Sequence, residues 1–103
     1  MRLEVKIKKG SVYIMKNETH DFYCTQCGHL VLPVFRTGRI REKGHLKNLW
    51  CPYCKKENNC AEISNNYTIE MFRYEFEHHN FTEDGTRIYK VETMIKHFKE
   101  EIE

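Results

Sequence analysis

Two Cys-x-x-Cys pairs, at residues 24–27 and 51–54, are the strongest constraint on how this chain folds. Two residues between paired cysteines allow a tight turn to present both sulfurs to one ion, and structural zinc prefers four tetrahedral ligands such as thiolates. The chain has only 103 residues, of which 31% are charged, so a metal that joins two distant turns would supply much of its folding free energy. We therefore predict one structural Zn²⁺, bound by Cys24, Cys27, Cys51 and Cys54.

The residues next to the cysteines suit such turns. Gly28 follows the first pair, where a positive φ is easily adopted, and Pro52 stiffens the first inner position of the second turn. The 23 residues between the pairs are enough for a hairpin that brings the two turns together. Iron in a rubredoxin-like site is the chemical alternative, because the same thiolates bind it. Free thiols or a redox-active pair are disfavoured, since neither pair lies in a thioredoxin-like strand–helix setting.

Residues 22–63 resemble a zinc ribbon, in which two rubredoxin-type knuckles, here CTQCG and CPYC, each follow a short strand. The second knuckle departs from the usual pattern, with Lys55 where glycine is common. The stretch GHLKNLWCPYC is also similar to small zinc-ribbon proteins of Gram-positive phages and mobile elements. The resemblance implies a role in transcription, translation or a nucleic-acid enzyme, or in protein docking, and the fold alone does not choose among these.

We predict a small α+β protein that forms one compact domain. An N-terminal β-hairpin occupies residues 1–21, a zinc ribbon of short antiparallel strands occupies 22–63, and an acidic extension with one or two helices occupies 64–103. Alternating apolar residues predict strands at 2–8 and 12–15, with a polar loop at 17–21. In the ribbon we expect strands at 29–35, 45–50 and 60–63 and a polar turn at 55–59. Pro33 confines the first of these strands to a sheet edge or ends it.

The C-terminal part contains two candidate helices. Residues 67–77 are ambiguous, because Phe72, Tyr74 and Phe76 alternate with charged residues as in a strand, whereas the wider apolar spacing fits a helix. We favour the helix, with Asn66 or Thr68 as its N-cap. A second helix is predicted from apolar residues at helical spacing, namely Val91, Met94, Ile95, Phe98 and Ile102.

The charge is distributed unevenly along the chain. Residues 36–56 contain seven Lys and Arg residues and one acidic residue, Glu42, for a net charge of +6. Residues 70–103 contain nine acidic and five basic residues, for a net charge of −4. The molecule is therefore expected to be polarised, with a basic middle and an acidic C-terminal part.

The basic middle is the best functional indication in the sequence. Lys and Arg bind phosphates, and aromatic side chains stack on exposed bases. We expect a non-enzymatic adaptor that contacts nucleic acid through a basic hairpin with Arg36, Arg39, Arg41, Lys43, Lys47, Trp50 and Tyr53. Two alternatives stay open: a protein-binding module of a phage or mobile element that engages or inhibits a host factor, and a solvated hairpin whose aromatic residues pack in the core.

Three further features of the sequence bear on the site. Cys60, next to Ala61, is expected to be a small core residue, and His29 is expected to support the metal ligands without binding the ion itself. His79 and Asn80 suggest a metal-dependent nuclease of the HNH type. However, such a site needs these residues spaced apart and in another order, so an enzyme is only the third hypothesis.

The sequence contains no long apolar run and no apolar segment of a secretory signal near its start. It has five cysteines, four of them in the two pairs, which fits metal binding in a reducing compartment better than a disulfide framework. We expect a cytoplasmic protein with no membrane association and no evident small-molecule substrate.

Overall fold

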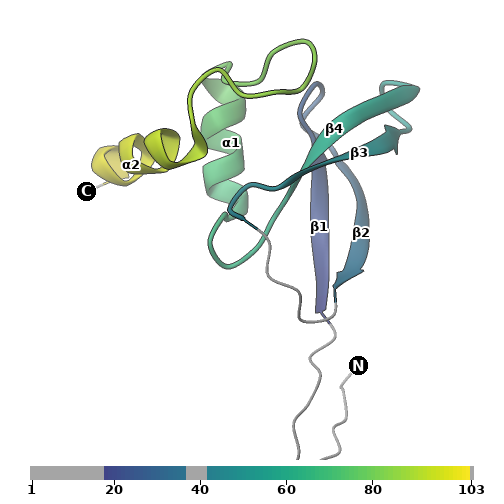
Figure 1. Cartoon of the computed structure of the whole chain (residues 1–103), viewed down its shortest axis with the longest axis horizontal. Helices are drawn as coiled ribbons and strands as arrows, with labels where there is room; N and C mark the ends of the chain where they lie inside the picture. Colours follow the sequence, from purple (N-terminus) through teal and green to yellow (C-terminus); the bar gives the residue numbers. More distant parts are fainter. Residues whose placement is uncertain (1–17, 37–41, 103) are drawn as a thin grey trace, which may run out of the picture.

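The computed structural model describes residues 18–36 and 42–102, with only the backbone described at residues 18 and 36. A four-stranded antiparallel sheet lies beside two helices (Figure 1). In chain order the elements are β1 (Glu18–Cys24), β2 (Leu30–Arg36), β3 (Leu46–Cys51), β4 (Lys56–Glu62), α1 (Ile69–Glu77) and α2 (Val91–Ile102). The α+β class is confirmed, and the predicted strands at 2–8 and 12–15 lie outside the described residues.

The sheet consists of two hairpins that pair side by side, with the strand order β2-β1-β4-β3. The first Cys-x-x-Cys turn joins β1 to β2, and the second joins β3 to β4. The two central strands, β1 and β4, pair antiparallel with Cys24 opposite Cys60, which puts the two turns at the same end of the sheet. The prediction that the 23 residues between the cysteine pairs form one hairpin is wrong. They supply β2 and β3, at opposite edges of the sheet, because each strand pairs with its neighbour across a cysteine turn.

Two polar segments that we expected to be irregular are strands. Residues 18–21 of the predicted loop belong to β1, and 56–59 of the predicted turn belong to β4. Each segment pairs with the other strand of its own hairpin, 18–21 with β2 and 56–59 with β3, and this pairing satisfies backbone groups regardless of side-chain polarity. Pro33 lies within β2, an edge strand, as its missing N–H requires.

The sheet has an apolar cluster on each face. One face contains Phe22, Cys24, Cys51 and Cys60, which are fully buried. On the other face Ala61 packs with Tyr67, Phe72 and Ile95 from the helical part. The rings of Tyr23 on β1 and Phe72 on α1 lie 5.4 Å apart, so α1 covers this face directly. The metal-ligand cysteines are therefore part of one core, and the helix packs on the other.

Helix α1 confirms the helical interpretation of residues 67–77. Thr68 is its N-cap, and the Thr68 hydroxyl accepts a hydrogen bond of 3.3 Å from the backbone N–H of Met71. The alternation of aromatic and charged residues gave a misleading strand signal, because Phe72 is buried whereas Tyr74 and Phe76 are only half-buried at the borders of the packed face.

Helix α2 is also confirmed, and it buries Met94 and Ile95. Its Phe98 packs edge-on against Tyr74 of α1, with ring centroids 5.5 Å apart, whereas Ile102 is exposed at the end that points away from the sheet (Figure 1). In the described part of the chain no helix is long and apolar enough to cross a membrane.

A buried carboxylate connects α1 to the loop before α2. Glu75 is only 1% exposed and accepts hydrogen bonds from the Tyr67 hydroxyl, from Asn80 Nδ2 at 2.7 Å, and from Arg87 Nε and Nη2 at 2.8 and 3.1 Å. Arg87 Nη1 also donates to the carbonyl oxygen of Gly44 at 2.8 Å. Every oxygen of Glu75 thus has donors, and Arg87 ties the loop to both the helix and the connection that precedes β3.

We predict that Arg87→Met lowers the free energy of unfolding by about 3–5 kcal/mol, because it leaves the Glu75 carboxylate buried without its cation. Urea denaturation of the metal-loaded protein measures this loss. The matched control is Arg73→Met on the exposed surface of α1, which should change stability by less than about 0.5 kcal/mol. Adding Glu75→Leu to Arg87→Met should restore part of the loss, and equal effects of the two arginine variants would contradict the prediction.

Candidate metal centre

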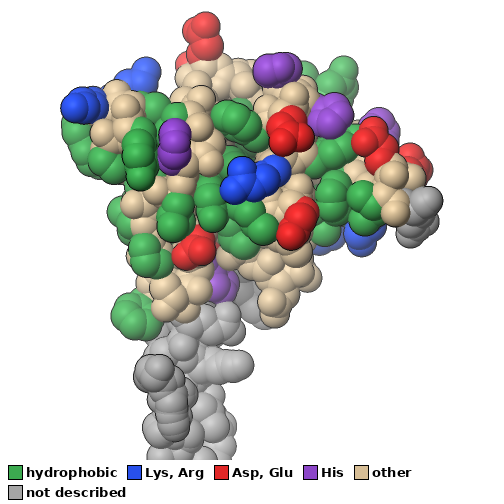
Figure 2. All heavy atoms as spheres, turned by 180° about the vertical axis from the view of Figure 1, so that it is seen from behind, with side chains coloured by type: hydrophobic (Ala, Val, Ile, Leu, Met, Phe, Trp, Pro, Cys, Tyr) green, Lys and Arg blue, Asp and Glu red, His purple; other side chains and the backbone are tan. Residues whose placement is uncertain are grey.

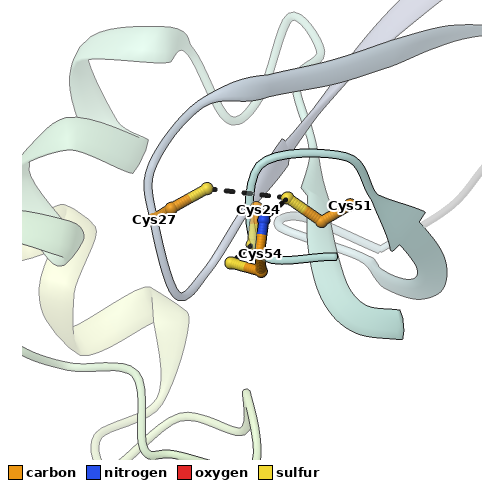
Figure 3. Close-up of side chains that lie close together, drawn as sticks. All are labelled: Cys24, Cys27, Cys51 and Cys54. Atoms are coloured by element: carbon orange, nitrogen blue, oxygen red, sulfur yellow. Dashed lines mark hydrogen bonds between the residues drawn. The ribbon is translucent and has the colours of Figure 1, made fainter. Parts of the chain in front are cut away.

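The four predicted metal ligands come together at one end of the sheet (Figure 3). The Sγ atoms of Cys24, Cys27, Cys51 and Cys54 all lie within 4.8 Å of one another. The Cys27–Cys51 sulfur distance is 3.6 Å and the Cys24–Cys54 distance is 3.9 Å. A tetrahedral site with metal–sulfur bonds of about 2.3 Å requires sulfurs about 3.8 Å apart. The geometry therefore fits one metal ion at the centre, and the predicted convergence of the four cysteines is confirmed.

The two cysteine turns have the same backbone construction. In the first knuckle the N–H of Gly28 donates to the carbonyl oxygen of Cys24 at 2.9 Å, and in the second the N–H of Lys55 donates to Cys51 at 2.7 Å. Both donors have a positive φ, 78° for Gly28 and 60° for Lys55. The lysine that departs from the usual knuckle pattern thus adopts the same left-handed conformation, with the strain that a Cβ brings there.

Hydrogen bonds from amides point at two of the sulfurs. Cys24 Sγ accepts from the backbone N–H of Gln26 at 3.3 Å and from Asn58 Nδ2 at 3.4 Å, and Cys51 Sγ accepts from the N–H of Cys54 at 3.4 Å. Donors of this kind stabilise thiolates. The hydrogen bond from Asn58 to Cys24 was not predicted. The sequence gives only a slight indication of it, namely a polar residue two positions before Cys60 in a strand that is mostly buried.

Burial opposes the ionisation of two of the thiols in the absence of a cation. Burial raises the pKa of Cys27, and the neighbouring Cys51 and Cys24 thiols raise it further. Burial also raises the pKa of Cys54. At Cys51 burial acts in the same direction, but the backbone N–H groups of Cys54 and Tyr53 lower its pKa overall. A bound cation would offset the cost of burying the thiolates, and four soft sulfurs match a thiophilic metal rather than Mg²⁺ or Ca²⁺.

The first knuckle is packed against α1. A Cβ atom added to Gly28 would lie 3.0 Å from Cζ of Phe76, so only glycine allows this close approach as well as the positive φ. The ring of His29 stacks on Tyr53 of the second knuckle, with centroids 4.2 Å apart and planes 17° apart. His29 was expected to support the ligands, and it does so through its backbone, since its carbonyl oxygen accepts from the N–H of Cys24 at 3.0 Å.

Cys60 lies outside the cluster of four. It is fully buried among Phe22, Cys24 and Cys51, and burial raises the pKa of its thiol to about 12. The interpretation of Cys60 as a small core residue is confirmed.

The residues predicted to contact a partner do not share one surface. Arg39 and Arg41 lie outside the described residues, as does the side chain of Arg36. Lys43 lines a hollow with residues of α2, among them Glu92 and Glu100. Lys47 and Trp50 are both exposed, but the pairing of β3 with β4 puts them on opposite faces of β3, because Lys47 pairs with Cys60 and Trp50 with Glu57.

Trp50 and Tyr53 are 57% and 59% exposed, so the alternative in which these aromatic residues pack in the core is wrong. The reason is their position at the edge strand β3 and at the tip of the second knuckle, which α1 does not cover. The rear face of the molecule shows exposed hydrophobic side chains between isolated charged ones (Figure 2).

Asn80, one of the residues that suggested a nuclease, has a structural role. It is 1% exposed, and besides its bond to Glu75 its Nδ2 donates to the carbonyl oxygen of Tyr89 at 3.1 Å. Its Oδ1 accepts from the backbone N–H of Tyr89 at 2.9 Å. Among residues 18–36 and 42–102 the cysteine cluster is the only group of His, Cys, Asp or Glu side chains that could hold a metal ion.

Comparisons with protein-family models, with curated proteins and with solved structures find no match for this chain.

We predict that Cys51→Ala abolishes stoichiometric metal binding and unfolds the sheet end that carries the knuckles, because three sulfurs cannot close the site. Elemental analysis of purified protein and circular dichroism measure the two effects. Cys60→Ala is the matched control, since it removes an equally buried thiol outside the cluster and should keep one metal per chain. Full metal content in Cys51→Ala would contradict the assignment.

We also predict that metal affinity rises with pH. The raised pKa values of Cys27 and Cys54 mean that these thiols are protonated in the metal-free protein at neutral pH, so binding displaces their protons. Affinity should fall by about tenfold per pH unit for each displaced proton as the pH is lowered from about 8 to 6. Competition with a chromophoric chelator measures it, and an affinity independent of pH would show that the thiols are not the ligands.

Proposed function

We propose that this chain is a zinc-binding adaptor without enzymatic activity, which binds nucleic acid beside its second knuckle. The observation that carries the proposal is the exposure of Trp50 and Tyr53, which flank the metal ligand Cys51. Large aromatic side chains are normally buried in a small domain, so two that stand in solvent next to a rigid turn are suited to stacking on a partner.

The proposed metal is zinc in a structural role. Four thiolates fill a tetrahedral site and leave no open position for a substrate, as in structural zinc centres. Iron would bind the same ligands, but Cys27 and Cys54 are only half-buried, and exposed Lys55 and Lys56 follow the second knuckle. Redox iron centres are tuned by an apolar, solvent-shielded surrounding, which this knuckle does not provide.

Exposed lysines lie in the same β3–β4 hairpin as the aromatic pair, with Lys47 on the opposite face of β3 from Trp50. Lys47 on β3, and Lys55 and Lys56 after the second knuckle, are all exposed. Phosphate groups bind such side chains with a free energy that comes from counterion release and therefore depends on salt. The five residues at 37–41, among them Arg39 and Arg41, add two more cations to the same stretch of sequence.

A second candidate is a protein-binding module, such as one of a phage or mobile element that engages a host factor. The observation that favours it is the edge strand β2, which exposes Leu30, Leu32 and Phe35. An edge strand with exposed apolar side chains can pair with a strand of another protein. Such docking would persist at moderate salt and after nuclease treatment, whereas binding to nucleic acid would not.

We predict that Lys47→Glu combined with Lys56→Glu weakens the binding of nucleic acid by at least about tenfold at low salt. Two lost phosphate contacts should also reduce the slope of log K against log salt by about 1.4–1.8. Fluorescence anisotropy of labelled oligonucleotides over a salt series measures both quantities.

The matched control for this double variant is Lys96→Glu combined with Lys99→Glu, which makes the same charge change at exposed positions of α2. This control variant should alter the affinity for nucleic acid by no more than about twofold, because it changes the long-range electrostatic potential of the molecule but removes no phosphate contact at the proposed site. If the parent protein binds neither DNA nor RNA at low salt, or if both double variants weaken binding equally, the proposed site is wrong.

A further inference from the structure

A hollow of about 530 Å³ lies between the two knuckles and α1. Its walls include Tyr23 from β1, Gly28 and His29 from the first knuckle, Tyr53 from the second, and Arg73 and Phe76 from α1. Its volume falls within the range of about 300–1,000 Å³ that is typical of small-ligand sites. We call it the knuckle–helix hollow.

One side of the knuckle–helix hollow is a preformed aromatic platform. The rings of His29 and Tyr53 are stacked, 4.2 Å apart and nearly parallel, and each comes from a different knuckle. Both residues lie within two positions of a cysteine of the metal cluster, so closure of that cluster fixes the platform. Both side chains are exposed, which leaves room for a third ring against the stack or at its edge.

The opposite side of the hollow offers a cation without a partner. Arg73 is exposed on α1, and within the described parts of the chain its guanidinium makes no hydrogen bond or ion pair. Glu70 and Glu77 lie one turn away on either side of it, but neither is within ion-pair distance. No Asp or Glu is among the described residues that line the hollow, whose lining is completed by Leu30 and by the metal-ligand candidate Cys27. Its lining is therefore complementary to a ligand that combines an aromatic ring with a negative charge.

We propose that the knuckle–helix hollow binds one nucleotide of a single-stranded nucleic acid, with its base stacked at the His29–Tyr53 platform and a phosphate held by Arg73. This inference rests on the proposed function and specifies its substrate. A duplex is excluded because the faces of its bases are covered by their neighbours, whereas an unpaired nucleotide presents a free face. Arg73 donates to phosphate oxygens in the planar, two-pronged geometry that suits them.

The test is the affinity for a single strand of about 12 nucleotides, as RNA and as DNA, and for a duplex of the same sequence, measured by fluorescence anisotropy. We expect Tyr53→Leu to weaken single-strand binding by roughly tenfold, the size of one lost base stack, and Tyr53→Phe to keep it. Arg73→Gln should weaken it and reduce the salt slope by about 0.7, the value for one phosphate on a single strand.

The matched controls are Tyr89→Leu and Lys99→Gln. Tyr89 is as exposed as Tyr53, at 62%, but lies outside the hollow, and Lys99 is an exposed cation on α2. Both controls should bind like the parent protein, and all variants should keep one metal per chain, because none of them changes a ligand.

The outcomes separate the two proposals. If nucleic acid binds but Tyr53→Leu or Arg73→Gln binds it as tightly as the parent, or if the duplex binds as tightly as the single strand, this inference is overturned and the proposed function stands. If no oligonucleotide binds at low salt, both are overturned. A preference for single strands that both variants lose, and both controls keep, supports the nucleotide site.

Discussion

The pairing of β1 with β4 is the constraint on which the rest of the molecule depends. Each hairpin ends in a turn that carries two cysteines, and the Cys24–Cys60 register of the central pair sets these turns next to each other. The sulfurs then lie at the separations that a tetrahedral metal requires. Neither hairpin alone could bind the ion with four ligands. An ion bound there would therefore stabilise the sheet, because its binding free energy would contribute to the free energy of folding.

The helical part is held to this sheet by polar as well as apolar contacts. Phe72 and Ile95 bury apolar surface against the sheet, while Glu75 and Arg87 fix the loop between the helices by a paired buried charge. A bidentate pair of this kind is specific in geometry because both nitrogens and both oxygens must align. The pair therefore fixes the position of the short helices more precisely than hydrophobic contacts alone would.

The metal ligands and the helices could be predicted because their signals are local. Two residues between cysteines and a period of 3.6 among apolar residues depend only on nearby sequence. The central strands were missed where Glu18–Asp21 and Lys56–Asn59 look like loops, since their polar side chains give no strand pattern and their conformation is set by backbone pairing within each hairpin. The structural roles of Glu75 and Asn80 were also missed. A polar or charged residue is expected at the surface, and the sequence does not show that Glu75 pairs with Arg87, twelve positions away. The knuckle–helix hollow could not be predicted either, because it forms only where the two knuckles and α1 come together in the folded chain.

The contact between Gly28 and Phe76 has a consequence for how the molecule would respond to its surroundings. It joins the first knuckle to α1 with no space for an added methyl group, so a change in the shape of that turn must move the helix or the ring. An ion bound by the first knuckle would therefore also stabilise the position of α1 and the surface that the two form together. Under the proposed function, recognition by that surface would therefore depend on the bound metal.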